Sequence, residues 1–350
     1  MSLPDVMAGI ILVVLIVYVL LGGADFGGGV WDLAARGPRA GRHREIIAHA
    51  IGPIWEANHV WLIVAVVLLF TCFPSAFAVI MTALHVPVTL MLIGIVLRGS
   101  SFAFRKVDPA GEGGPSGWQT VFAVSSLITP VMIGVVAGTV STPVLGYENG
   151  VVTGGFFRPW LAPFPWLVGA FTLSLVALLA AAYLTLEAKE PELREDFRVR
   201  MLAAAGAVAL TGGLAAALAH AAAPELSSHL TGTSAGRTVM AAGTAALAGA
   251  ALLVWRRRWY GARNLAALTA VLVLVGWGWG LHPWIVTGAV AVDAGAAPPV
   301  TLKIVAWILA GGSVILVPAY VYLYATFKGE VLFPRKPGRE RPDPEPIDDP

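Results

Sequence analysis

The stretch VMAGIILVVLIVYVLLGGADFGGGVWDL, residues 6–33, decides the fold class of this chain. Apart from Asp25 and Asp32 it is uncharged, and an α-helix needs roughly 20 apolar residues to cross about 30 Å of hydrocarbon. The whole sequence of 350 residues has the same character, with 57% hydrophobic and 13% charged residues. Soluble domains carry about twice that share of charge. A soluble globular fold is therefore excluded, and we predict an all-α polytopic membrane protein.

Apolar runs of sufficient length recur along the chain and predict about nine transmembrane helices in a single integral membrane domain, residues 1–333. Residues 334–350 contain six prolines and mixed charges with little apolar surface, which predicts a disordered cytoplasmic tail. The predicted helices cover about residues 6–33, 46–71, 76–97, 118–140, 164–186, 201–222, 238–254, 265–281 and 301–327.

The basic residues predict how the chain is oriented in the membrane. Of the 23 Lys and Arg residues, 20 lie in alternate connections and the tail, and only Arg158, Arg237 and Lys303 lie on the other side. The positive-inside rule then places the N-terminus outside and the C-terminus in the cytoplasm. No Lys or Arg precedes the first apolar run, so we expect that helix to be retained. A scattered net charge of +2 does not suggest a nucleic-acid partner.

Two carboxyl groups lie inside predicted membrane helices, where a charge needs a partner, water or a function. Asp25 precedes Arg36 by eleven residues, which is about 16 Å along a helix. Glu56 follows Arg44 by twelve residues, which is about 18 Å. Since both basic residues belong to the same short connection, we expect the two carboxyls at similar depth and facing each other.

Further polar groups share the helix faces that carry these carboxyls. The second predicted helix has His49, Gly52, Glu56 and His59 at steps of three, four and three residues, which forms one stripe. Asp32 lies seven residues after Asp25 and shares its face. Exchangeable groups running from the cytoplasmic edge to mid-membrane indicate a proton relay. The alternative is structural, with Asp25 neutralised by Arg98 on the third predicted helix.

Metal and nucleotide sites are disfavoured. Residues 56–59 form one Glu-x-x-His pair, whereas di-iron bundles need two such pairs and two more carboxylates. His85 and His220 are the candidates for haem ligation, but isolated helical histidines are more often packed or hydrogen-bonded. A single cysteine, Cys72, excludes an internal disulfide and thiolate clusters. The glycines at 27–29 follow no strand, so we interpret them as a site of close helix packing.

Three stretches carry a resemblance to a known family: GGADFGGG at residues 22–29, IGPIWEANHVWL at 51–62 and LRGSSFAFR at 97–105. Weaker similarity continues through GWGW at 276–279 and PPVTLK at 298–303. The sequence resembles subunit II of cytochrome bd-type quinol oxidases over nearly its whole length. The Trp-Glu-x-Asn-x-x-Trp pattern within the second stretch is the most specific part.

The resemblance implies nine transmembrane helices, arranged as two four-helix bundles and a peripheral helix, in the bacterial inner (plasma) membrane. It implies a heterodimer with a homologous subunit I that carries b- and d-type haems and the quinol site. Such a complex is a terminal oxidase of aerobic respiration, an oxidoreductase that oxidises quinol, reduces dioxygen to water and takes protons from the cytoplasm. This chain would be its non-redox subunit and bind no haem or metal firmly. Whether a structural quinone or lipid binds here stays open.

The resemblance also implies roles for the polar residues. An acidic residue of the second helix belongs to the proton path, and Glu56 stands here where many relatives have Asp. Asp25 would be a second acid or the partner of Arg98, and which carboxyl is the main carrier stays open. The remaining assignments are His49, His59 and Asp32 as relay neighbours, and Trp55, Asn58, Trp61 and Arg98 as the structural frame of the site.

Two other functions compete with this reading. A stand-alone proton-coupled secondary transporter also predicts mid-membrane acids and helices interrupted by Gly or Pro, but it would show inverted repeats and a substrate pocket. A purely structural subunit would belong to the same family and leave the polar stripe inert.

Overall fold

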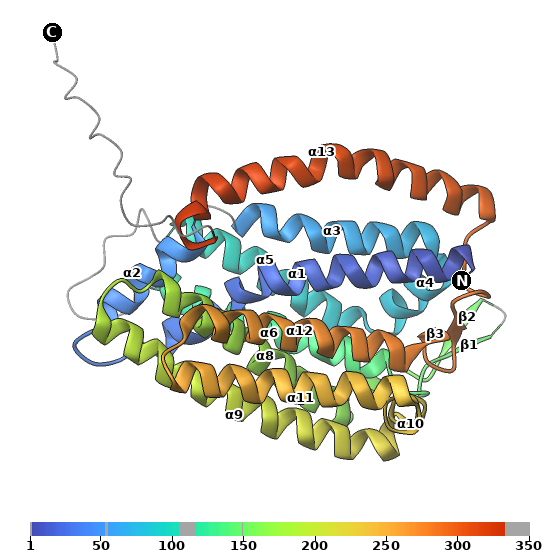
Figure 1. Cartoon of the computed structure of the whole chain (residues 1–350). Coiled ribbons are helices and arrows are strands. Elements are labelled where there is room, and N and C mark those ends of the chain that lie inside the picture. The colour runs from blue at the N-terminus through green and yellow to red at the C-terminus, as the bar shows by residue number, and fades with distance from the viewer. Residues whose placement is uncertain (1, 53–54, 105–116, 149, 333–350) are drawn as a thin grey trace, which may run out of the picture.

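The computed structural model describes residues 2–52, 55–104, 117–148 and 150–332. It is mostly helical, with two small β-hairpins at one end (Figure 1). Within those residues nine helices are long and apolar enough to cross a membrane, as the sequence predicts. They are α1 (Leu3–Leu33), α3 (Trp55–Cys72), α5 (His85–Phe104), α6 (Gly117–Val140), α8 (Pro163–Glu187), α9 (Pro191–Ala222), α11 (Ser234–Trp255), α12 (Trp259–Leu281) and α13 (Pro299–Leu332).

Short elements connect these helices. The antiparallel pairs β1–β2 and β3–β4 lie together at one end of the molecule, where Tyr147 pairs with Val152 and Trp284 with Ala291. The short elements are α2 (Ala40–Ile51), α4 (Pro74–Ala83), β1 (Gly146–Glu148), β2 (Val151–Thr153), α7 (Arg158–Leu161), α10 (Pro224–Gly232), β3 (Trp284–Val286) and β4 (Val290–Ala291).

Two predicted helices are wrong as single elements. The segment 46–71 is divided into α2, which ends at Ile51, and α3, which begins at Trp55. Pro53 lies between them, and proline has no amide hydrogen to continue the helical ladder. The segment 76–97 is divided into α4 and α5 because Pro87 has no N–H to donate to the carbonyl of Ala83. The predicted tail, residues 334–350, lies outside the described residues.

Helix α1 is central and contacts α3, α6, α8 and α12. Its glycine run makes this possible, as the sequence predicts. A Cβ atom on Gly27 would lie 2.0 Å from the carbonyl oxygen of Val176 in α8, and one on Gly29 would lie 2.2 Å from the Ser126 Cβ in α6. Asp25 lies two residues before Gly27, so this packing holds it deep among its neighbours.

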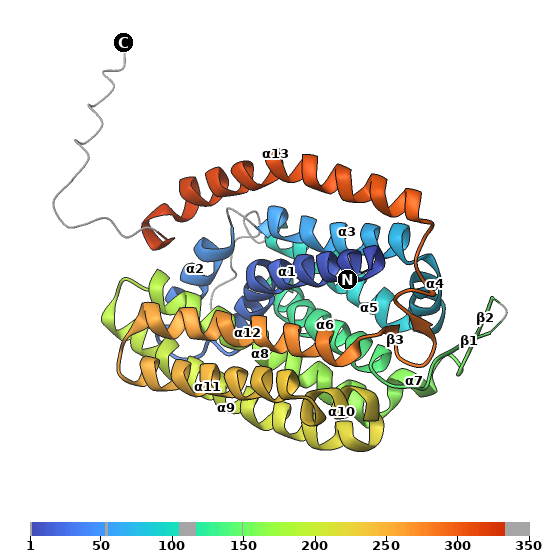
Figure 2. The same ribbon diagram turned by 45° about the vertical axis from the view of Figure 1, so that its right-hand side comes forward.

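Two main apolar clusters surround α1. One draws its buried side chains largely from α1, α3, α4, α5 and α6, and the other from α8, α9, α11 and α12. Helix α13 lies along the edge of the molecule beside α3 and α1 in both views (Figures 1 and 2). Its surface is mostly exposed.

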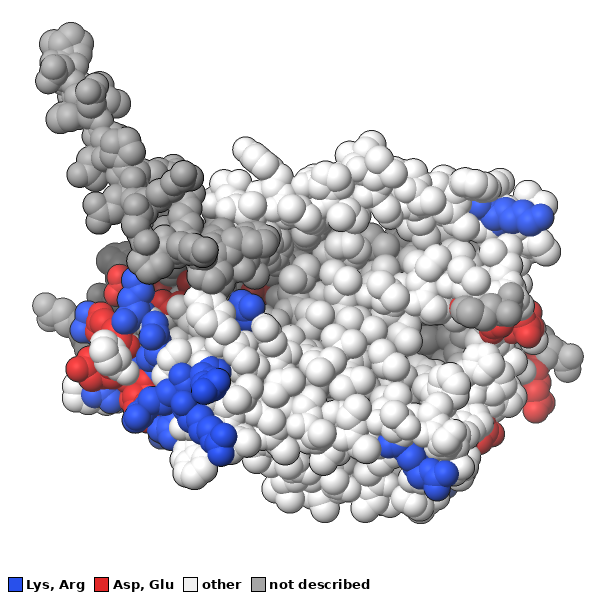
Figure 3. Space-filling model, in the orientation of Figure 1, with Lys and Arg blue, Asp and Glu red and all other residues white. Residues whose placement is uncertain are grey.

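Charged residues lie at the two ends of the helices. Figure 3 shows Lys and Arg gathered at the end where α2 lies, which we call the basic end, and a broad uncharged band between the ends. Large apolar side chains are exposed along α3, α5, α11 and α13 within that band. A surface of this kind is stable only in a bilayer or against another apolar protein.

Candidate functional site

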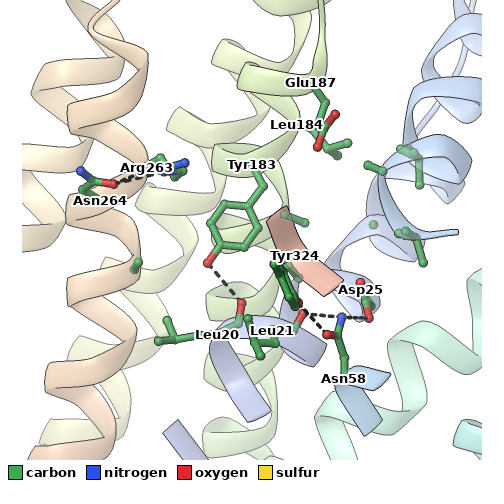
Figure 4. Close-up of a pocket in the computed structure, with 17 residues that line it drawn as sticks. Leu20, Leu21, Asp25, Asn58, Tyr183, Leu184, Glu187, Arg263, Asn264 and Tyr324 are labelled. Atoms are coloured by element: carbon green, nitrogen blue, oxygen red, sulfur yellow. Dashed lines mark hydrogen bonds between the residues drawn. The ribbon is translucent and has the colours of Figure 1, made fainter. Parts of the chain in front are cut away.

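A hydrogen-bonded chain of polar side chains links α1, α3 and α13. Asp25 is 5% exposed, and its Oδ2 accepts a hydrogen bond of 2.8 Å from Nδ2 of Asn58. The Oδ1 atom of Asn58 accepts one of 2.7 Å from the Tyr324 hydroxyl (Figure 4). A second tyrosine of α13, Tyr320, donates to the carbonyl of Ala57. Asn58 of α3 thus binds the carboxyl of Asp25 on α1 directly, and Tyr324 of α13 holds Asn58 in place.

Arg98 of α5 is the buried cation of the site, with 1% of its surface exposed. Its guanidinium lies over the rings of Phe26 and Phe122, at 4.9 and 5.5 Å, and near enough to Asp25 for direct electrostatic attraction. Two opposite charges can remain buried when each offsets the desolvation of the other. The structural alternative of the sequence, in which Arg98 neutralises Asp25, therefore has a geometric basis.

His59 lies next to Arg98, and this contact determines which nitrogen of the imidazole carries the proton. The Nη1 atom of Arg98 lies 3.1 Å from Nε2 of His59. A guanidinium can only donate, so Nε2 accepts and the proton of the neutral imidazole is on Nδ1. Trp55 packs against the same imidazole, with ring centroids 6.3 Å apart, and Trp61 packs on Tyr320 at 5.2 Å. The two tryptophans of the predicted frame thus lie beside His59 and Tyr320.

Several buried polar atoms around this site lack a hydrogen-bond partner within the described parts of the chain. All of them can donate a hydrogen bond. They are the Tyr18 hydroxyl, Nδ1 of His59, Nε1 of Trp61, and Nε and Nη2 of Arg98. Leaving a buried donor unsatisfied costs about 1–3 kcal/mol, and proteins commonly meet that need with internal water.

The predicted stripe of the second helix is not continuous. His49 is exposed on α2, whereas Glu56 and His59 belong to α3. Glu56 is exposed, and it precedes Asn58 by two residues, which is about 200° around a helix. Since Asn58 points to Asp25, Glu56 points the other way. The structure therefore does not bring the two carboxyls together.

Asp32 is buried farther along α1, with 1% of its surface exposed. Its Oδ2 accepts a hydrogen bond of 3.3 Å from Nε2 of Gln119 in α6. It is the second-last residue of α1 and lies nearer the basic end than Asp25. The sequence places Asp25 and Asp32 on one face of this helix, and both are buried there.

A cavity of about 310 Å³ adjoins Asp25. Its walls are mainly apolar side chains of α1, α2, α8 and α12. The polar residues that line it, several of which Figure 4 shows in place, are Asp25, Asn58, Tyr183, Glu187, Arg263, Asn264 and Tyr324.

Sequence reasoning missed the tyrosines of this site. Tyr183 donates to the carbonyl of Leu20, and Tyr324 holds Asn58. One signal was present, because Tyr320 and Tyr324 are four residues apart and so share a face of an otherwise apolar helix. Which helix that face would meet could not be read from the sequence.

A separate polar cluster joins α2 to α9 at the basic end. His43 is 4% exposed; its Nε2 lies 2.9 Å from Oδ2 of Asp196, and its Nδ1 lies 3.2 Å from Nη2 of Arg200. Arg39 pairs with the same Asp196 through two hydrogen bonds of 2.8 Å. Because Arg200 can only donate, His43 is neutral and donates from Nε2. The cluster fastens α2 to the transmembrane helices.

The docking of α2 is expected to weaken in acid. Burial lowers the pKa of His43, and the Arg200 guanidinium lowers it further, whereas Asp196 acts in the opposite direction. The unfolded segment therefore binds a proton more readily than the docked one, so the stability from docking is complete above pH about 6.5 and falls as the pH drops below it. Amide hydrogen exchange of residues 40–51, corrected for its intrinsic pH dependence, should accelerate there.

His43→Gln should remove this pH dependence, and His49→Gln should keep it because His49 is exposed on the same helix. Equal pH dependence in the wild type and the His43 variant would contradict the assignment.

His85 and His220, the candidates for haem ligation, lie on the surface of the molecule. The Nδ1 atoms of His85 and His220 contact the carbonyls of Thr82 and Ala216, and both side chains are exposed. The cavity beside Asp25 has no histidine, cysteine or methionine in its lining. Within the described residues no three His, Cys, Asp or Glu side chains gather in a way that would hold a metal ion.

These features define a class: a multi-pass α-helical membrane protein with ionisable groups buried among its apolar helices. The family model for cytochrome bd terminal oxidase subunit II matches residues 3–327, and the chain belongs to that family. The transporter alternative is not favoured by this result.

Curated relatives agree with the assignment. The chain is 32% identical over 140 residues to cytochrome bd ubiquinol oxidase subunit 2 of Bacillus subtilis, which covers 39% of this chain and 40% of that one. It is 30% identical over 177 residues to cytochrome bd-I ubiquinol oxidase subunit 2 of Escherichia coli, covering 49% and 45%. The aligned stretches thus span less than half of each relative.

A solved structure shares the fold. A chain of the bd oxidase from Geobacillus thermodenitrificans superposes with a TM-score of 0.77 at 20% identity, covering 96% of this chain and 100% of that one. The similarity extends over nearly all of the helices described above.

Proposed function

We propose that this chain is the non-redox subunit II of a quinol:dioxygen oxidoreductase. In this proposal it pairs with a subunit I that carries the b- and d-type haems and the quinol site, and it supplies part of the path by which protons reach the site of oxygen reduction. The observation that carries the proposal is the buried Asp25, which is hydrogen-bonded to Asn58 and lies beside Arg98 among apolar helices. Such groups are costly in a membrane unless they serve a function.

The surface of α3 supports a protein partner. Glu56, Val60, Ile63, Val67 and Phe70 are all exposed and follow one another at steps of four, three, four and three residues. They form one stripe along the helix, which we call the α3 stripe. An ionised carboxyl next to lipid is unfavourable, so a protein with a polar group opposite Glu56 covers this stripe better than lipid does.

The proton path is assigned to the residues that the sequence singles out. Glu56 is the principal carrier because it lies on the α3 stripe, from which a proton can pass to the partner. His49 on α2 and His59 on α3 are its relay neighbours. Asp25 and Asp32, both buried on α1, supply a second branch. The basic end lies in the cytoplasm and the N-terminus outside, since Lys and Arg prefer the cytoplasmic side.

The helices are proposed to form two four-helix bundles with α13 at the periphery. The composition of the two apolar clusters supports this grouping, because one draws on α8, α9, α11 and α12 and the other on helices from the first part of the chain. The position of α13 at the edge, beside α3 and α1, agrees with it.

Purification of the chain alone and together with its partner tests the proposed function. Haem absorbance and quinol oxidation are expected only from the pair, because the proposal places the haems and the quinol site in subunit I. Haem absorbance or quinol oxidation by the isolated chain would contradict the proposal. Solute flux through vesicles that contain the isolated chain would instead support a transporter.

A further inference from the structure

The cavity beside Asp25 has two polar ends. Glu187 is the last residue of α8, and Arg263 and Asn264 lie in the first two turns of α12, so these three side chains mark the basic end. Glu187 and Arg263 are partly exposed and Asn264 is exposed, whereas Asp25 and Asn58 at the other end are buried. Figure 4 shows Tyr183 to one side of Glu187 and Asp25, with its hydroxyl pointing toward Leu20.

We infer that this cavity holds water and carries protons from the basic end to Asp25, with Glu187 as the group that collects them. The inference rests on the proposed function, which requires proton uptake, and adds its route and a further proton-handling residue. Protonation of the Glu187 carboxylate from solvent is followed by transfer through cavity water to Asp25. Each transfer breaks one O–H bond and forms another, with no change of oxidation state.

Most of the cavity wall is apolar, and its polar side chains are the groups that can hold water there. At about 30 Å³ for each molecule, 310 Å³ corresponds to roughly ten waters. Internal water needs two to four polar partners, and cavities without them stay dry. Seven polar side chains line this one. An acyl chain in the same space would remove water from the Asp25 carboxyl and leave it without that solvation.

The rim of the cavity leaves Glu187 in reach of solvent. The Nε and Nη2 atoms of Arg263 donate to Oδ1 of Asn264 at 3.1 and 3.0 Å, which holds this guanidinium against its own helix. The two side chains thus occupy the α12 side of the rim, and Glu187 occupies the α8 side (Figure 4). A carboxylate at this position exchanges protons with the bulk solution.

The unsatisfied donors continue the polar region on the other side of Asp25. Nε and Nη2 of Arg98, Nδ1 of His59 and the Tyr18 hydroxyl are buried without a partner among the described residues. Asp25 interacts electrostatically with both Arg98 and Tyr18. Water that satisfies these donors would lie within reach of Asp25, so Asp25 stands between cavity water and a second hydrated group.

Thiol accessibility in the purified complex tests whether the cavity is wet. With Cys72 replaced by Ala, Ala24→Cys at the buried end and Ala267→Cys nearer the rim are treated with a cationic methanethiosulfonate. Ala245→Cys on the exposed face of α11 is the matched control in an equally apolar helix. Since the reactive thiolate forms only where water reaches, we expect both cavity thiols to react roughly tenfold faster than the control.

Mass spectrometry of this chain measures the modification without any assay of activity. Equal, slow labelling of the cavity and control thiols would overturn the inference. So would labelling that appears only after lipid is extracted, because the cavity would then be a lipid site. Neither result bears on whether the complex oxidises quinol.

Substitution at the rim tests whether the water carries protons. Glu187→Gln should slow both proton uptake and oxygen consumption by the complex roughly tenfold, a modest loss for one proton-transfer group. Glu192→Gln removes the same charge from an exposed site at the same end and should leave both unchanged. Unchanged proton uptake in the Glu187 variant would overturn the route, whereas an inactive wild-type complex would overturn the proposed function instead.

Discussion

Oxygen consumption by the assembled complex is expected to fall roughly 100-fold when Glu56 is replaced by Gln, the lower end of what one positioned proton-transfer group contributes. The amide is close in size to the carboxyl but cannot accept and release a proton. Glu56 is exposed in this chain and does not hold the buried pair of Asp25 and Arg98, so the variant should still fold and bind its partner. An oxygen electrode together with a pH-sensitive dye in vesicles measures turnover and proton uptake.

Two variants make this result specific. Glu56→Asp keeps a carboxyl and should retain most of the activity. Glu225→Gln makes the same chemical change on α10, away from the basic end, and should have no effect. Wild-type turnover and proton uptake in the Glu56→Gln complex would rule out Glu56 as the carrier. Asp25→Asn is a less direct test, because it leaves Arg98 buried without its counter-charge and is expected to destabilise the fold.

Gly27→Ala is expected to prevent assembly of the complex or to lower its thermal stability severely. The added Cβ would lie 2.0 Å from the carbonyl oxygen of Val176 and 2.6 Å from the Cβ of Ala180. Because the first of these atoms belongs to the backbone of α8, the two helices must separate rather than rearrange a side chain. Overpacking typically costs about 1–3 kcal/mol, and we expect a loss of about 3 kcal/mol or more here.

Gly9→Ala is the matched control in the same helix. No atom lies within 4 Å of the added Cβ at that position, so the only effect is on helix propensity, a gain of roughly 0.5–1 kcal/mol. The yield of haem-containing complex and its Tm in detergent compare the two variants. Equal Tm values for both would show that α1 and α8 do not pack as closely as the structure indicates.

Two of the predicted helices match the structure closely. The predicted helices 118–140 and 164–186 agree with α6 and α8 to within one residue at each end. The second and third predicted helices, 46–71 and 76–97, were wrong as single elements. A continuous apolar run does not reveal where the hydrogen-bond ladder of a helix breaks. The prolines at 53 and 87 were visible, but other prolines, such as Pro130 in α6, lie inside an unbroken helix. Only the three-dimensional packing decides between these outcomes.

The sequence alone determined the class of protein and the number of helices, nine among the described residues, that are long and apolar enough to cross a membrane. Hydropathy and charge are sums over neighbouring residues of the chain. They can therefore be evaluated without knowing how the helices pack. Tertiary structure alone decided that Asp25 bonds to Asn58, that Tyr324 bonds to the same Asn58, and that Glu56 points away from Asp25. These helices are apolar on nearly all sides, so their sequences do not fix how each is rotated about its axis. Close contacts such as the one at Gly27 fix that rotation, and with it the partners of every buried charge.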